Sequence, residues 1–133
     1  MKKKISIAID AMGGENAPHK TIEGVGLFIK ENSKKDDFLI NLYGDETSIK
    51  DKLNELNISS SLIKIIHTDS TVSDEETPLT AIKNSKNTSM WNCINAQISG
   101  GADISLSAGN TGVLLVVSRM ILKMMSEVSK PAL

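Results

Sequence analysis

The chain has 133 residues, of which 40% are hydrophobic, 23% charged and 3% aromatic, and its 15 basic and 16 acidic residues leave a net charge of −1. This length predicts one globular domain over residues 1–133, and the balanced charge argues against a nucleic-acid partner. A single cysteine, Cys93, excludes an internal disulfide and a thiolate cluster, and favours a reducing, cytoplasmic location.

The first elements are a strand, a loop and a helix. Residues 4–10 alternate isoleucine with small residues, which predicts a strand covered on both faces, and residues 11–18 form a loop rich in Gly, Asn and Pro. A helix is expected from His19, with apolar residues at spacings of three and four. Gly24 and Gly26 weaken a helix, so we expect this one to pack closely against a neighbour.

The later elements continue this alternation. In chain order they are a strand at 38–43, a helix marked by Ile49, Leu53 and Leu56, a strand at 62–66, a polar acidic loop at 68–77, a helix that begins at Pro78, a helix capped by Thr88 or Ser89 with Met90, Ile94 and Ile98 buried, a strand at 103–106, and an apolar helix that ends at about Met125. No apolar run approaches the roughly 20 residues that span a bilayer. The pattern predicts a three-layer α/β/α fold with a mainly parallel sheet.

Two junctions between a strand and a helix stand out, at residues 10–18 and 107–112. Both follow predicted parallel strands, so we expect them to face one crevice at the carboxyl edge of the sheet. Glycines let a backbone approach a ligand closely, and the N–H groups and dipole of a helix N-terminus favour an anion such as phosphate. The alternative is that the glycines only form tight turns and that Asn110 or Thr111 only caps a helix.

Charged residues near this edge supply further candidates. Asp10 ends the first strand and Asp45 follows the second, where each could transfer a proton or simply cap a turn. Lys83 and Lys86 could bring positive charge to the crevice, or belong to a solvated helix face.

The sequence lacks the motifs of several other chemistries. There is no phosphate-binding loop ending in Gly-Lys-Ser/Thr, no dinucleotide Gly-x-Gly-x-x-Gly and no Gly-x-Ser-x-Gly elbow. Cys93 lies on a predicted buried face, and the two histidines lack ligand spacing. We therefore expect no metal, no cofactor and no covalent nucleophile.

Five segments together resemble the N-terminal part of the bacterial phosphate acyltransferase (PlsX) family. They are Asp10–Pro18, Gly44-Asp45, the stretch from Thr77-Pro78 to Thr88-Ser89-Met90, Ser107–Gly112 and Lys130–Leu133, which match in order and spacing. The resemblance covers about two-fifths of the family's usual length. It implies a fold similar to phosphate acetyltransferases and isopropylmalate dehydrogenases, incomplete here at its C-terminus.

The resemblance also implies an activity and partners. The family forms acyl-phosphate from acyl-[acyl-carrier-protein] and inorganic phosphate in phospholipid biosynthesis, as a homodimer associated peripherally with the membrane, and supplies a membrane-bound glycerol-3-phosphate acyltransferase. Carried over, the phosphate and acyl-phosphate site would comprise Asp10, Gly13, Gly14, Ser107, Gly109, Asn110, Thr111 and Gly112, and the candidate catalytic residues are Asp10, Asn110 and Lys83. Asn110 would donate its side-chain hydrogen bond to the anion, and Lys83 stands where the family pattern has arginine.

Two other functions remain open at the level of sequence. One is a catalytically inactive binding or interaction remnant of that enzyme. The other is a small phosphate- or nucleotide-binding α/β domain unrelated to acyl transfer.

Overall fold

The computed structural model describes residues 2–132 and contains one four-stranded parallel sheet in the order β3-β2-β1-β4. The strands are β1 (Ile5–Asp10), β2 (Phe38–Gly44), β3 (Ile63–His67) and β4 (Ile104–Leu106). The helices are α1 (His19–Glu31), α2 (Glu46–Glu55), α3 (Pro78–Lys83), α4 (Ser89–Ile98) and α5 (Thr111–Leu122), and a short 3₁₀ helix, η1 (Ser85–Asn87), lies between α3 and α4. The predicted α/β class and parallel sheet are confirmed.

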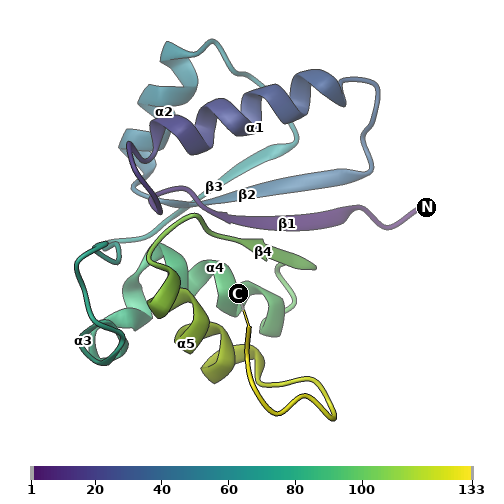
Figure 1. Cartoon of the computed structure of the whole chain (residues 1–133). Helices are drawn as coiled ribbons and strands as arrows, with labels where there is room; N and C mark the ends of the chain where they lie inside the picture. Colours follow the sequence, from purple (N-terminus) through teal and green to yellow (C-terminus); the bar gives the residue numbers. More distant parts are fainter. Residues whose placement is uncertain (1, 133) are drawn as a thin grey trace.

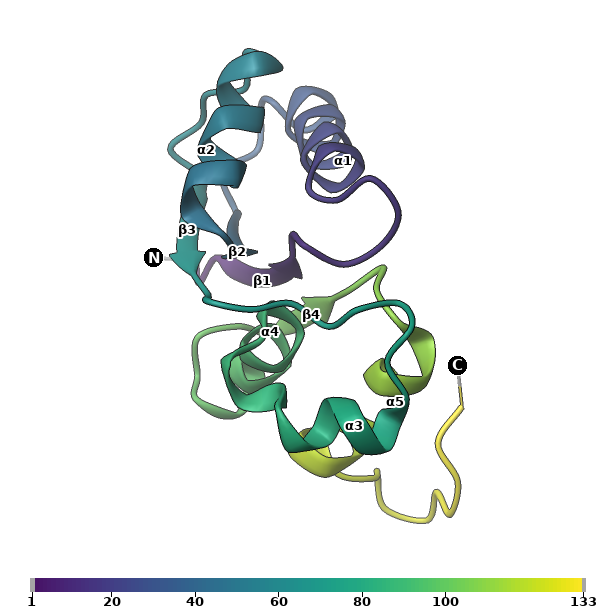
Figure 2. The same cartoon turned by 90° about the vertical axis from the view of Figure 1, so that its left-hand side faces the viewer.

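The helices form a layer on each face of the sheet. Figure 1 shows α1 and α2 above the sheet and α3, α4 and α5 below it, and the turned view in Figure 2 shows the same division. The chain adds β2 and then β3 on one side of β1. It then crosses back to add β4 on the other side of β1, and the helices of this second part lie on the opposite face of the sheet. The direction of winding therefore reverses between β1 and β4, which makes this the topological switch point where open α/β sheets bind ligands.

The alternation in β1 explains how the two layers pack. Ile9 faces α1 and joins the larger core with residues such as Ile22 and Ile40, whereas Ala8 faces α4 and packs with Cys93. Small side chains on this second face let α4 approach the strands closely, and the Ser105 hydroxyl donates to the Cys93 carbonyl at 2.9 Å.

Two local expectations were wrong, and a third holds at only one of its two glycines. Ile98 is 62% exposed, because α4 ends there and no described element covers its last turn. α5 ends at Leu122 rather than near Met125, because Lys123 takes a positive φ of 63° that a right-handed helix cannot continue. A Cβ on Gly26 would lie 2.5 Å from Ile58 Cδ1, as close packing predicts, but a Cβ on Gly24 would meet nothing within 4 Å.

Candidate functional site

A chain of hydrogen bonds joins the loops that follow β1 and β4. The Asp10 carboxylate is 2% exposed; its Oδ1 accepts from the Met12 N–H at 3.1 Å and its Oδ2 from the Ser107 hydroxyl at 2.8 Å. The Ser107 Oγ in turn accepts from the Gly109 N–H at 3.1 Å. The expectation that the two junctions meet at one edge is confirmed, and Asp10 positions both of them.

Glycines make this contact between the loops possible. A Cβ added to Gly13 would lie 2.7 Å from Asp10 Oδ2 and 2.8 Å from the Gly109 nitrogen, and one added to Gly109 would lie 2.9 Å from Met90 Cε. Gly14 adopts a φ of +94°, which other residues rarely adopt. Close packing of the loops against each other therefore requires glycine at all three positions.

The second loop ends at the N-terminus of α5. Asn110 Oδ1 accepts from the Val113 N–H at 3.2 Å and so caps the helix. Within residues 2–132, the hydrogen bonds give no partner to the N–H groups of Thr111 and Gly112, which lie at the positive end of the helix dipole. These two N–H groups are the donors that α5 offers to an anion.

The side-chain amide of Asn110 serves a different purpose from the one expected. Its Nδ2 donates to the carbonyl oxygens of Ser73, Asp74 and Glu76 at 3.2, 3.3 and 2.8 Å. The amide is thus engaged in fastening the acidic loop at 68–77 to the start of α5. Its position identifies Asn110 as a residue that holds a loop, rather than as a free donor beside the junction.

A cavity of about 460 Å³ opens beside the paired loops, and Asp10, Ser107, Ala108 and Lys20 are among the residues that line it. The rest of its lining is mainly apolar and extends along α1 to Phe28. The Lys20 side chain is 60% exposed and its Nζ lies 3.9 Å from Glu15 Oε2, so it can turn toward an anion at low cost. Sequence reasoning missed Lys20, although its position in the first turn after the Gly-rich loop was a usable signal.

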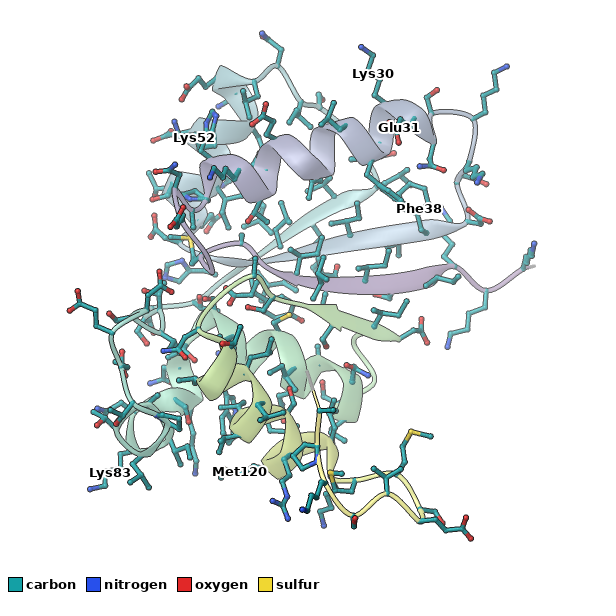
Figure 3. The ribbon with its side chains drawn as sticks, viewed as in Figure 1. Lys30, Glu31, Phe38, Lys52, Lys83 and Met120 are labelled. Carbon is teal, nitrogen blue, oxygen red and sulfur yellow. The ribbon has the colours of Figure 1, made fainter. Side chains whose placement is uncertain are left out.

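Two other candidates lie elsewhere. Lys83 is the last residue of α3, and its side chain points away from the rest of the molecule in Figure 3. Among the described residues, no hydrogen bond or ion pair joins Lys83 to either loop. Asp45 caps α2, accepting from the Ser48 N–H at 2.8 Å and from its hydroxyl at 2.7 Å, and the hydroxyl bond, followed by the N–H bond, lowers the pKa of Asp45. The capping interpretation of Asp45 therefore has direct support.

The remaining reactive side chains serve the fold. Burial raises the pKa of the Cys93 thiol to about 12, so it is protonated at neutral pH and cannot act as a thiolate nucleophile. His67 Nδ1 accepts from the Glu46 N–H at 3.2 Å. Within the described part of the chain, no three His, Cys, Asp or Glu residues cluster as a metal site would require, and no helix is long and apolar enough to cross a membrane.

Comparison with known proteins gives a consistent result. The chain is 44% identical over 133 residues to a phosphate acyltransferase of Pelagibacter ubique, and 39% identical over 134 residues to one of Parvibaculum lavamentivorans. Both alignments cover the whole chain but only 38% and 36% of these relatives. A phosphate acyltransferase of Streptococcus pyogenes serotype M18 is 42% identical over 127 residues, which are 96% of the chain and 36% of that relative.

The chain thus spans little more than a third of the length of these relatives and aligns with their N-terminal part. The sequence profile of the family described as "Fatty acid synthesis protein" matches residues 5–133, almost the entire chain. The chain belongs to the fatty acid synthesis protein family.

Proposed function

We propose that this chain forms the phosphate-binding part of an enzyme that transfers an acyl group from acyl-[acyl-carrier-protein] to inorganic phosphate. The observation that carries the proposal is the pair of loops at the switch point, fastened together by the Asp10–Ser107 hydrogen bond beside two unpaired N–H groups of α5. Relatives of this chain bear the name phosphate acyltransferase, which agrees with an anion site at this edge.

Phosphate is held at this site by charge and backbone donors together. The N–H groups of Thr111 and Gly112 donate to its oxygens, and the Lys20 ammonium pairs with its negative charge. Asp10 is fully engaged with Met12 and Ser107, so its role is to fix the loops rather than to receive a proton. Gly13, Gly14 and Gly109 serve the site by letting the loops approach one another.

The reaction itself needs little beyond positioning. An oxygen of hydrogen phosphate forms a bond to the thioester carbonyl carbon, the carbon–sulfur bond breaks, and the carrier leaves as a thiolate. The thiolate gains a proton from water, and the new acyl-phosphate returns the proton of hydrogen phosphate to water. Because a thioester is already activated, holding phosphate in line with the carbonyl and stabilising the developing oxyanion lowers the barrier. This chemistry uses no metal, cofactor or enzyme nucleophile.

The same proposal includes the setting of the enzyme. It is a cytoplasmic homodimer that docks peripherally on the membrane and delivers acyl-phosphate to a membrane-bound glycerol-3-phosphate acyltransferase. The 133 residues would form part of one α/β domain whose remainder corresponds to the longer part of the relatives.

The test measures acyl-phosphate formation from palmitoyl-[acyl-carrier-protein] and radioactive phosphate. It uses this chain followed by the remaining sequence of the Pelagibacter ubique relative, beside the 133-residue chain alone. In the extended protein we expect Lys20→Gln to raise the KM for phosphate about tenfold, because it removes one charged contact worth about 1.4 kcal/mol.

Lys30→Gln is the matched control, since Lys30 lies on the same helix and its side chain points away from the sheet (Figure 3). Its KM for phosphate should stay at the value of the unsubstituted protein. An extended protein that is folded but forms no acyl-phosphate contradicts the proposed activity. An unchanged KM in Lys20→Gln contradicts the role of Lys20. If the 133-residue chain alone is inactive but still binds phosphate, it is the binding part of the enzyme.

A further inference from the structure

An apolar groove runs along the face of the sheet that carries α1. The groove is the apolar part of the cavity described above: residues of β1, β2 and β4 form its floor, and α1 forms its wall with Gly24 and Phe28. Leu106 of β4 lines it and is 59% exposed; Ile104, two residues earlier on the same face of the strand, is 50% exposed. Apolar side chains of a parallel sheet are normally covered on both faces, so this surface lacks part of its layer.

The uncovered area follows from the winding of the chain. The right-handed crossover from β3 to β4 places α4 on the opposite face, and α5 lies beside it there in Figure 1. On the near face, α1 and α2 cover β1, β2 and β3. Within residues 2–132, no helix covers β4 on this face.

Gly24 is the most informative residue of the groove. Glycine in the middle of a helix is unfavourable, and Gly26 has a local reason to be there because a side chain would collide with Ile58. Gly24 has no such reason, since a Cβ there would point into open space. A glycine that is unfavourable for α1 and unexplained within this chain fits a site where another backbone approaches α1 closely.

Two observations favour polypeptide over an acyl chain in this groove. It has a helix wall on one side only, because β4 is the edge strand, so a bound acyl chain would remain open to water along that side. The relatives are also much longer than the aligned region: the alignment covers 38% of the Pelagibacter ubique protein, which leaves the other 62% outside it. That length is ample for a covering element.

We propose that the groove between α1 and β4 is the seat of an amphipathic helix from the part of the full-length protein that the longer relatives carry, packed against Gly24, Phe28 and Leu106. The inference does not depend on the acyl-transfer activity, and its tests do not measure activity.

The first test compares the effect of Gly24→Leu on Tm in two proteins. In the 133-residue chain, leucine favours helix and covers apolar surface, so we expect Tm to rise by about 3–5 °C. In the chain extended with the Pelagibacter ubique sequence, the same side chain would enter the helix interface, and we expect Tm to fall by at least as much. A rise of similar size in both proteins overturns the proposal.

The second test measures access to the groove with a maleimide. Gly24→Cys introduces a thiol whose labelling is easily read, because Cys93 is buried and has a raised pKa of about 12. We expect labelling to be at least about tenfold slower in the extended protein than in the 133-residue chain. Lys30→Cys on the solvent side of α1 is the control and should label equally in both (Figure 3).

The same cysteine distinguishes the other possible occupants. Protection of Gly24→Cys in the 133-residue chain by sodium palmitate, without protection in the extended protein, overturns the proposal in favour of an acyl chain. Protection that grows with the concentration of the 133-residue chain overturns it in favour of a second copy. If the extended protein does not fold, the intact Pelagibacter ubique enzyme carries the cysteine at the position aligned with Gly24. Peptide mass spectrometry then measures labelling of that cysteine in the intact enzyme. Labelling as fast as in the 133-residue chain overturns the proposal, and labelling at least about tenfold slower supports it.

Discussion

The Asn110 side chain makes two separable contributions at the start of α5. Its oxygen caps the helix, and its nitrogen fastens the loop at 68–77 through three backbone carbonyls. Aspartate caps helices about as well as asparagine but has no hydrogen to donate at neutral pH. One substitution can therefore remove the second contribution and keep the first.

We expect Asn110→Asp to lower the free energy of unfolding by about 1–3 kcal/mol, because the carbonyls lose their donor and face a carboxylate. Urea unfolding measures this change. Hydrogen exchange should quicken at the amides of Ser73 and Glu76, whose hydrogen bonds lie within the loop, and stay slow at Val113, which the cap still protects. Unchanged exchange in the loop would show that Asn110 does not hold it.

At the scale of elements, four of the described helices begin on a side chain that accepts from an N–H of the first turn. The caps are Asp45 for α2, Thr77 for α3, Thr88 for α4 and Asn110 for α5. Only the first carries a charge, which adds a favourable interaction with the helix dipole and makes the cap sensitive to pH. α2 is thus the helix whose N-terminal cap should weaken in acid.

Because the pKa of Asp45 is lowered in the folded protein from its ordinary 3.8, its contribution is complete above that value and is lost as the pH falls through the lowered pKa. Asp45→Asn keeps a neutral cap that does not titrate. We expect the Tm of the unsubstituted chain to exceed that of Asp45→Asn at about pH 7, and the difference to vanish by about pH 2. A difference that stays constant over this range would contradict the assignment.

At the scale of the whole molecule, the two faces of the sheet are built differently. Large aliphatic residues fill the space beneath α1 and α2, whereas Ala8, Ala96 and Ala102 bring α4 close to the strands around Cys93. The Cys93 thiol lies in the middle of the second face and is fully buried. A reagent can reach it only when the helix layer separates from the sheet.

Cys93 should therefore report on opening of the whole domain. We expect iodoacetamide to label it at least about 1,000-fold more slowly in the folded chain than in concentrated urea, since opening of a core this central requires most of the stability of a small domain. The rate should rise with urea in parallel with the loss of helical circular dichroism. Fast labelling without added urea would show that α4 opens by itself.

Much of this architecture could be predicted because it follows from local patterns. The alternation in β1, the periodicity of the helices and the parallel order of strands place the loops after Asp10 and Leu106 at one edge. The contacts made there depend on tertiary packing, which no spacing encodes. Gly24 and Gly26 look alike in sequence but face open space and Ile58 respectively. The two lysines also could not be told apart by spacing. Only the folded structure shows that Lys20, at the start of α1, lines the cavity and that Lys83, at the end of α3, does not.

The bond between Ser107 and Asp10 spans 97 positions of the chain. β1 pairs with β2 and β2 with β3, so each of these pairs joins strands that follow one another in the chain and can form early. Pairing of β4 with β1 must instead close the longest loop between paired strands. We therefore expect the candidate site to be assembled late in folding. An anion that binds it stabilises only chains that have completed that step, so phosphate should slow unfolding and raise Tm, and Tm should keep rising with the logarithm of the phosphate concentration above the Kd.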